Sequence, residues 1–442
     1  MKIEFLNHAS VKIKNKEVTL LKDPWYQGNA FHKGWTLLEE FTNNQINSLL
    51  ADVTHIWISH EHPDHFSILF YKTFLYRLKK NNVVILFQKT NDQRVKKFFV
   101  KIALTFQELE FDQPTEIGKE FNVTCFKDGF YDSGLLVEAD GKKILNLNDC
   151  NITTAARADE VFKVTGECNV LLTQFSYAAW KGGKANIGWR KDAAAQKLDT
   201  VQLQVEKFKP EFLIPFASFV YFSNENNSYL NDGVNTPRDV VNKLSKLDVS
   251  VVVMKPWDIF SGQYNSSTVN RAVDFWDLKF SSVPEMHVNK FDLIAINDLS
   301  EMFGVYKARV FQNNSRKFML FINMVSPVKA FKPINIHLTD LDKTVCIDIF
   351  ASGLRGINTE PHLCMSSESL KFIFANTFGF DTLTVNGCFE EGSKGGFSLA
   401  TRTFAIENLN NIGINMTPFF VFRIDVIMLF LSLLRKVNNK LL

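Results

Sequence analysis

The feature that most constrains this fold is a run of three histidines and one aspartate, His60-Glu-His62-Pro-Asp64-His65. It follows a largely apolar run that predicts a buried strand, and the residues behind it predict a helix. Side chains at such a strand end lie on a rigid edge and face one cleft. Neutral imidazoles and carboxylates suit zinc, iron or manganese. With only nine histidines in 442 residues, a metal site is a better interpretation than a chance surface cluster.

The spacing of the motif predicts how the ligands divide. Alternation on extended backbone puts His60, His62 and Asp64 on one side, and His65 turns back toward them at the helix start. One metal ion would then bind His60 and His62, and a second would bind Asp64 and His65. Asp149 also follows an apolar strand, so it is the candidate bridging carboxylate, with a hairpin cap as the alternative. Such a pair of ions activates water or, if iron, dioxygen.

The length and composition limit the class of protein. A chain of 442 residues exceeds one ordinary domain. A hydrophobic content of 46% with 22% charged residues describes a globular protein, and a net charge of +3 gives no reason to expect a nucleic-acid partner. The six cysteines form no CxxC pair, so we expect no disulfide framework and a cytoplasmic location.

No stretch of about twenty apolar residues is present to span a membrane, so we expect no transmembrane segment. The closest is 419–434, which Arg423 and Asp425 interrupt. A buried terminal helix is our expectation for it. A helix lying on a membrane surface or binding a partner is the alternative.

The order of the expected elements predicts an α/β fold. Antiparallel runs followed by strand–helix alternation occur twice, beginning near residues 2–21 and again near 120–147. This doubling predicts a four-layer αββα sandwich over residues 1–284.

From residue 285 onward the pattern changes. The runs 318–324, 333–338 and 345–350 predict strands, and 369–377 predicts a helix. No histidine–carboxylate cluster occurs in this part. We therefore expect a smaller α+β domain over 285–442.

Three further residues are candidates for contact with a substrate. The loop 28–35 contains His32 and Trp35, which would form either a substrate wall or a packed surface loop. His8 stands at the turn between the first two predicted strands. We expect it to act in catalysis together with Asp64 and Asp149, and a hydrogen-bonded turn histidine is the alternative.

A glycine-bearing loop supplies two cationic candidates. Lys181 precedes Gly182-Gly183, and Arg190 follows seven residues later. These side chains would bind a phosphate or carboxylate of the substrate, or would belong to a solvated lysine loop. The spacing is not that of a P-loop.

The sequence resembles the metallo-β-lactamase superfamily, whose HxHxDH signature stands complete at His60, His62, Asp64 and His65. Within it, the chain is most similar to the catalytic part of the cytidine monophosphate-N-acetylneuraminic acid hydroxylase family. The resembling stretches are 23–25, 28–35, 57–67, 143–150, 174–179, 181–183, 215–219 and 380–385.

The resemblance implies a metal-dependent oxygenase with one or two divalent ions, iron being favoured and zinc or manganese being alternatives. That family carries a Rieske domain, whose cluster needs CxH and CxxH ligand pairs. No such pair exists in this sequence. We therefore expect no Rieske cluster in this chain and a separate ferredoxin- or Rieske-type electron donor.

Two of the superfamily's usual metal ligands have no counterpart here. No histidine occurs between His65 and His287. Asp128, Asn224 and Glu225 are the oxygen-bearing residues that could replace them, or one metal position would be empty. An oxygen-rich ligand set favours iron or manganese over zinc.

Three functions follow from these observations. The first is a hydroxylase, monooxygenase-like, acting on an anionic sugar or sugar-nucleotide-like substrate. The second is a metal-dependent hydrolase of a phosphoester or amide, as in the superfamily at large. The third is a binding protein with a degenerate metal site.

Overall fold

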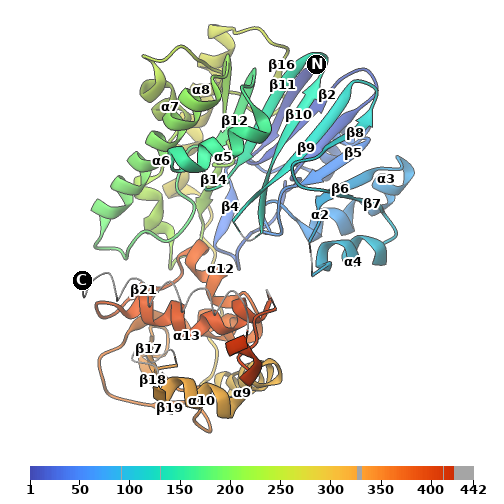
Figure 1. The fold of residues 1–442 in the computed structure, drawn as a ribbon. Helices are drawn as coiled ribbons and strands as arrows, with labels where there is room; N and C mark the ends of the chain where they lie inside the picture. Colours follow the sequence, from blue (N-terminus) through green and yellow to red (C-terminus); the bar gives the residue numbers. More distant parts are fainter. Residues whose placement is uncertain (91, 130, 326–330, 412, 423–442) are drawn as a thin grey trace, which may run out of the picture. The chain divides into compact units, whose positions relative to one another are not determined.

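The computed structural model of the chain describes residues 1–422 apart from 91, 130, 326–330 and 412 (Figure 1). It divides into two compact units, Met1–Asn289 and Lys290–Leu442, close to the boundary expected at residue 284. Most of the terminal helix expected over 419–434 lies outside the described residues, which end in the short 3₁₀ helix η3 (Pro418–Phe422).

The first sheet of the first unit combines antiparallel and parallel strands. Its first half is antiparallel, and the strands from β3 onward are parallel. In spatial order the strands are β16 (Ile259–Phe260), β1 (Lys2–Asn7), β2 (Ser10–Lys14), β3 (Thr19–Lys22), β5 (His55–Ile58), β6 (Val84–Gln88) and β7 (Thr105–Leu109).

The second sheet repeats this plan. Its antiparallel strands come first along the chain and the parallel strands follow. In spatial order they are β15 (Ser250–Val251), β13 (Phe212–Phe216), β12 (Val170–Gln174), β11 (Lys142–Asn148), β10 (Asp132–Ala139), β9 (Phe121–Asp128) and β8 (Pro114–Gly118).

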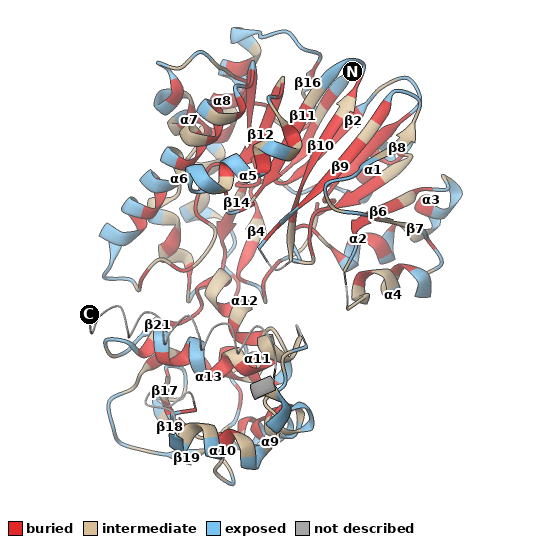
Figure 2. Ribbon diagram, in the orientation of Figure 1, coloured by how far each residue is buried: buried red, intermediate tan, exposed pale blue. Residues whose placement is uncertain are grey.

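Helices cover the outer face of each sheet (Figure 1). One core joins the first sheet to its helices through residues such as Ile56 and Phe99, and a larger core lies between the sheets and under the other helices. The strands are largely buried and the helices expose their outer faces (Figure 2). The αββα sandwich is therefore confirmed. The covering helices are α1 (Asn43–Leu49), α2 (Ile68–Thr73), α3 (Leu75–Lys80), α4 (Arg94–Lys101), α5 (Ala155–Thr165), α6 (Ile187–Phe208), α7 (Pro237–Leu244) and α8 (Ser266–Ser281).

The second unit is an α+β domain, as expected. Its sheet has the order β19 (Arg355–Gly356), β18 (Lys343–Ile347), β17 (Ile334–Leu338), β20 (Leu363–Met365) and β21 (Glu390–Glu391). Its helices are α9 (Ile296–Asn313), α10 (Arg316–Val325), α11 (Ser367–Ala375), α12 (Gly379–Asn386) and α13 (Gly396–Asn411).

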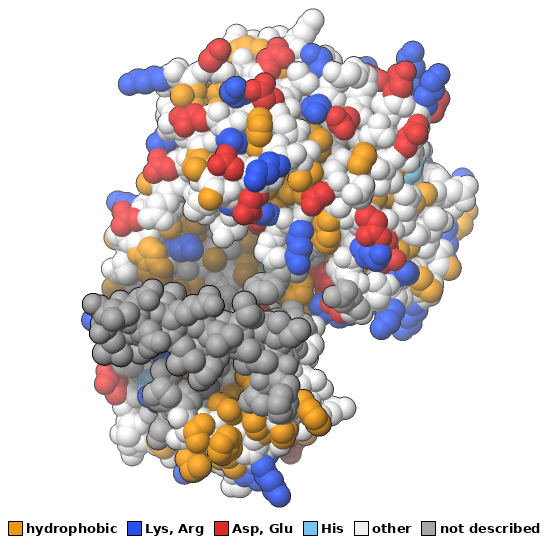
Figure 3. All heavy atoms as spheres, viewed as in Figure 1, with side chains coloured by type: hydrophobic (Ala, Val, Ile, Leu, Met, Phe, Trp, Pro, Cys, Tyr) orange, Lys and Arg blue, Asp and Glu red, His pale blue; other side chains and the backbone are white. Residues whose placement is uncertain are grey.

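One expected strand of this unit was wrong. Residues 318–324 lie in α10, which begins just after Ser315, whose hydroxyl accepts a hydrogen bond from the N–H of Phe318 at 3.4 Å. The run was ambiguous because a short continuous apolar stretch fits either a strand or a helix. The helix leaves Phe321 and Met324 52% and 75% exposed. Apolar side chains gather on the surface of this unit in Figure 3.

The described residues bear on two further sequence expectations. All six cysteines are free. Over the described part of the chain, no helix is long and apolar enough to cross a membrane.

Candidate metal centre

The histidine–aspartate motif follows β5 at the carboxyl ends of the parallel strands of the first sheet. Strand β5 is buried between β3 and β6, so the loop after it starts from a fixed position. Ser67 ends the loop by capping α2, because its hydroxyl accepts a hydrogen bond from the N–H of Phe70 at 3.3 Å. The single helix expected behind the motif is two short helices, α2 and α3.

The first group that could hold a metal ion is His60, His62 and Asp149. The Nε2 atom of His60 lies 2.7 Å from Nδ1 of His62 and 3.6 Å from a carboxylate oxygen of Asp149. Burial lowers the pKa of both histidines. They are therefore neutral near pH 7, which is the state that binds metal ions.

The second group is His8, Asp64 and His65, all of them buried. Nε2 of His65 lies 3.3 Å from Oδ2 of Asp64 and 3.7 Å from Oδ2 of Asp149. The same Asp149 oxygen is 3.6 Å from Nε2 of His60. Asp149 thus stands between the two groups, as a bridging carboxylate would.

His8 differs from the other histidines in how its ring is held. Its Nδ1 accepts a hydrogen bond from the N–H of Phe219 at 3.2 Å, so the neutral ring carries its proton on Nε2. That atom lies 3.3 Å from Oδ2 of Asp64. His8 is therefore placed to donate a proton or hydrogen bond rather than a lone pair.

Asp23 lies in the cluster, although the sequence reasoning did not include it among the site residues. Its carboxylate accepts hydrogen bonds from the backbone N–H and the hydroxyl of Ser59, both at 2.8 Å. It also lies 3.0 Å from Nδ1 of His65, which leaves Nε2 of that ring facing Asp64 and Asp149. A carboxylate behind a histidine in this way orients a metal ligand. Its only signal was its position at the end of a predicted strand.

The charges of the cluster are strongly coupled. Burial disfavours protonation of His65, but the carboxylates of Asp64, Asp149 and Asp23 outweigh it and raise the pKa of His65 well above its ordinary range. Burial opposes ionisation of Asp64, yet the neighbouring His65 and His8 hold the pKa of this carboxyl well below its usual value. Asp64 is therefore ionised at neutral pH.

Among the described residues, two buried carboxylate oxygens of the cluster have no hydrogen-bond partner, Oδ1 of Asp64 and Oδ1 of Asp149. A buried anionic oxygen without a partner is unfavourable unless a cation satisfies it. Together with neutral imidazoles, these atoms form a donor set that fits divalent metal ions.

Asp132, at the start of β10, is a second residue that the sequence reasoning missed. Its Oδ1 lies 3.8 Å from Nε2 of His60. Burial and the nearby charge of Asp149 raise the pKa of Asp132 to about 7. Asp128, four residues earlier, was chosen instead because no local pattern distinguishes the two.

The structure places Asp128 beside the cluster rather than in it. Its carboxylate accepts from the N–H of Asn151 at 2.5 Å and from Nε of Arg157 at 3.1 Å. Asn224 is buried, and its side-chain oxygen accepts from the N–H of Asn226 at 3.0 Å. The ligand roles of Asp128 and Asn224 stay predictions.

The loop containing His32 and Trp35 contacts the cluster through the adjacent Phe31. The ring of Phe31 contacts that of His62 with centroids 5.6 Å apart, and it packs on Trp35 at 4.7 Å. Trp35 is buried within the two-stranded sheet of β4 (Trp35–Leu37) and β14 (Val220–Phe222). His32 has a positive φ of 54° and is half-buried. The loop therefore lies beside the histidine–aspartate cluster, and contact of His32 and Trp35 with a substrate stays a prediction.

The two cationic candidates have different environments. Arg190 is buried and donates from Nε and Nη2 to Asp232 at 2.6 and 2.7 Å, and from Nη1 to the carbonyl of Gly183. Lys181 is half-buried, and its burial lowers its pKa. Arg190 thus holds the glycine loop in place, and Lys181 keeps its ammonium group available.

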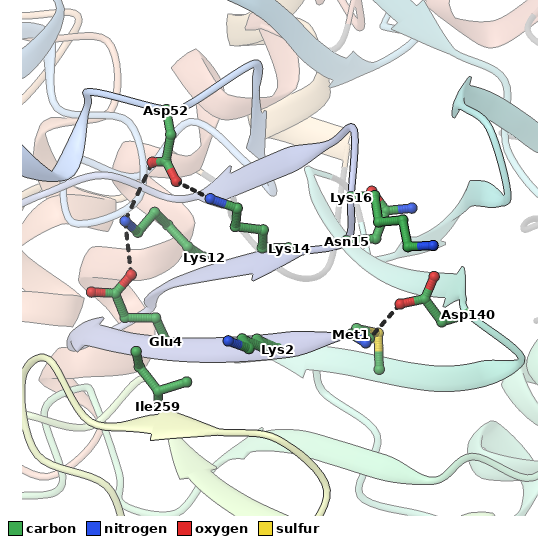
Figure 4. Close-up of a pocket in the computed structure, with 10 residues that line it drawn as sticks. All are labelled: Met1, Lys2, Glu4, Lys12, Lys14, Asn15, Lys16, Asp52, Asp140 and Ile259. Atoms are coloured by element: carbon green, nitrogen blue, oxygen red, sulfur yellow. Dashed lines mark hydrogen bonds and ion pairs between the residues drawn. The ribbon is translucent and has the colours of Figure 1, made fainter.

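A second charged cluster lies at the opposite strand ends, in a hollow of about 490 Å³ (Figure 4). Lys12 contacts Glu4 at 2.7 Å and Asp52 at 3.6 Å, and Lys14 contacts Asp52 at 2.6 Å. These carboxylates are balanced by lysines of the same unit.

No protein-family model matches the chain. The cytidine monophosphate-N-acetylneuraminic acid hydroxylase of Cricetulus griseus is 26% identical over 275 residues, which is 58% of this chain and 47% of that protein. The enzyme of Mus musculus is 27% identical over 277 residues, covering 58% and 46%. A Homo sapiens relative named as an inactive form is 26% identical over 278 residues, covering 58% and 52%. The chain spans about half the length of the curated relatives it matches.

Solved structures align less closely. CmlA, a diiron β-hydroxylase from Streptomyces venezuelae, has a TM-score of 0.36 at 16% identity, with 65% of this chain and 52% of that chain covered. A structure described as a possible metal-dependent hydrolase from Veillonella parvula has a TM-score of 0.43 at 15% identity, with coverage of 59% and 98%. At these scores the alignments carry no argument about activity.

The sheet order, the four layers and the HxHxDH motif after β5 are features of this chain itself. These features are those of the metallo-β-lactamase fold. Over 58% of its length the chain resembles the cytidine monophosphate-N-acetylneuraminic acid hydroxylases, and its first unit is a metallo-β-lactamase-like αββα sandwich.

Proposed function

We propose that the first unit is a metal-dependent oxygenase that hydroxylates an anionic sugar or sugar-nucleotide-like substrate. The observation that carries the proposal is the pair of histidine–aspartate groups that share Asp149. The names of the sequence relatives support the reaction and the substrate class. Two divalent ions, iron in our proposal, would supply activation of dioxygen when bound.

The residues would divide the work as follows. His60, His62 and Asp149 would hold one ion, and Asp64 and His65 with Asp149 would hold the second. Asp23 would keep Nε2 of His65 directed at the ion. Nε2–H of His8 would donate a hydrogen bond to Asp64 and hold this carboxylate in position.

The reaction requires electrons from outside the chain. Insertion of one oxygen atom of O₂ into a C–H bond reduces the other atom to water and consumes two electrons and two protons. The sequence has no CxH or CxxH pair to bind a Rieske cluster. We therefore propose a separate ferredoxin- or Rieske-type protein as the electron donor.

A metal-dependent hydrolase of a phosphoester or amide is the second candidate. The lack of Rieske ligand pairs favours it, since hydrolysis needs no electron donor. The same ligand groups also suit activation of water. The two candidates therefore differ in whether the purified protein needs an electron donor for turnover.

The test measures substrate-dependent oxygen consumption by the full chain, loaded with iron and supplied with a ferredoxin and its reductase. We expect consumption with a sugar-nucleotide carrying an acyl group, and no turnover of simple phosphoesters without reductant. His8→Gln should keep its metal and lose up to about a hundredfold in rate, because it removes the Nε2–H that holds Asp64 in position. The matched variant His62→Gln should lose metal as well. Ester hydrolysis without reductant and no oxygen consumption would favour the hydrolase.

A further inference from the structure

The long helix α6 carries two cations on its buried face, and only one of them has a partner. Lys197 stands four residues after Ala193 and four before Val201, two buried residues, so it lies on the same face. Arg190 lies on this face two turns earlier and is paired with Asp232 at 2.6 Å. Lys197 is half-buried. Among the described residues it has neither a hydrogen bond nor an ion pair.

The buried face of α6 is directed at the loop that carries Asp149. Gln204, two turns after Lys197, donates from Nε2 to the carbonyl of Ile152 at 3.2 Å and accepts from the hydroxyl of Thr173 at 2.7 Å. Ile152 is three residues beyond Asp149. This contact ties α6 to the segment after β11, so the helix face that carries Lys197 is turned toward the loop of Asp149.

The electrostatic surroundings of Lys197 agree with this placement. Burial lowers its pKa to about 8, while the negative charge of Asp149 acts to raise it and the positive charge of Lys181 acts to lower it. The contact of Arg190 with the carbonyl of Gly183 ties the glycine loop of Lys181 to the same face of α6. Lys181 likewise makes no hydrogen bond or ion pair within the described part of the chain. Two half-buried cations without a direct ion pair are unfavourable unless a ligand supplies one.

We propose that Lys197 and Lys181 together bind a phosphate group of the substrate beside Asp149. Two ammonium groups match the charge of a phosphate better than that of a single carboxylate. The proposal rests on the proposed function, since it assigns the anionic part of that substrate to a subsite. Lys197 adds to the site a residue from the middle of α6.

The experiment titrates the full-chain, metal-containing protein with inorganic phosphate in a calorimeter, at low salt and neutral pH. Lys197→Met and Lys181→Met are each expected to raise the dissociation constant about tenfold or more, because each removes a charge-assisted contact. Lys191→Met is the matched control, since Lys191 is exposed on the same helix. It should leave the dissociation constant unchanged.

Further measurements sharpen the result. Lys197→Arg keeps the charge and should bind phosphate within about threefold of the wild type. Acetate should bind more weakly than phosphate, and equal affinity would overturn the choice of a phosphate group. Lys197→Met should unfold at the wild-type temperature or above, because it removes an unpaired half-buried cation. It should also lose the rise in unfolding temperature that phosphate gives to the wild type.

Metal analysis of the same samples separates the two proposals. If the wild type holds no metal but Lys197→Met still weakens phosphate binding, the oxygenase fails and the subsite stands. If metal is present and Lys197→Met binds phosphate as the wild type does, the subsite is overturned.

Discussion

Two charged clusters lie at opposite ends of the strands of the first sheet, and they satisfy their charges differently. At the end where β1 begins, Glu4 and Asp52 are paired with Lys12 and Lys14. At the other end, the histidine–aspartate cluster buries two carboxylate oxygens that have no partner. The first cluster is complete within the protein, and the second needs a cation. Burial without a partner, and not the presence of acidic residues alone, is what marks the functional end.

Removal of the shared carboxylate should have the largest effect. Asp149→Ala takes one oxygen ligand from both groups, so we expect metal content to fall from two ions per chain to one or none, and activity to fall more than about a hundredfold. The measurement is elemental analysis with parallel rate assays. Asp52→Ala, at the paired end, should keep its metal. Equal loss from both variants would remove the distinction between the clusters.

The second prediction concerns Lys22, which is fully buried without a hydrogen bond and lies 4.9 Å from the ring centroid of Trp57. Burial lowers its pKa to about 7 from an ordinary 10.5. Between these values the unfolded chain binds more protons than the folded chain, so stability should rise with pH through this window. The gain is about 4–5 kcal/mol across the whole window.

Lys22→Met should remove most of this rise and raise stability at pH 7. Denaturant unfolding at pH 7, 8.5 and 10 measures it. A wild-type stability that is flat or falls from pH 7 to 10 would contradict the account of Lys22.

A smaller effect is expected behind the metal ligands. Asp23→Asn keeps the size of the side chain but weakens the hold on Nδ1 of His65. We expect metal affinity to fall about ten- to a hundredfold, as is usual for such supporting carboxylates. Competition with a chromophoric chelator measures the affinity. Unchanged affinity together with unchanged stability would mean that Asp23 has no part in the site.

The smallest effects belong to the paired end. Lys12→Met leaves Glu4 and Asp52 without their buried partner and should cost about 1–2 kcal/mol of unfolding free energy. Lys14→Met, in a more exposed pair, should cost less than about 0.5 kcal/mol. Denaturant unfolding gives both values. A change in metal content with either variant would mean that the lysine-paired cluster affects the histidine–aspartate cluster, and would contradict the view that the two are independent.

The sequence predicted the sandwich because strand and helix patterns are local and occur in the same order twice. The motif itself was equally local, since His60, His62, Asp64 and His65 share one loop. The sequence did not predict that Asp23 and Asp132 lie in the cluster, because each comes from a distant strand end and has no neighbouring motif. Only the folded chain shows that Asp23 supports His65.

The position of His8 illustrates the same limit. Its place at a turn was evident from the sequence, but the tautomer that makes it a donor depends on the N–H of Phe219, 211 residues away. The strand expected over 318–324 was wrong for a different reason. An apolar run of seven residues has no period that separates a strand from a helix.

If the carboxylate of Asp149 is shared by two metal sites, its removal must lower the metal content of the chain. The direct test is the metal content of the full chain purified without chelators, measured by mass spectrometry beside Asp149→Ala. We expect two ions per chain, mainly iron, in the wild type and one or none in the variant. A wild-type protein that retains no metal, or a variant that retains as much as the wild type, would contradict the role of Asp149 as a shared ligand.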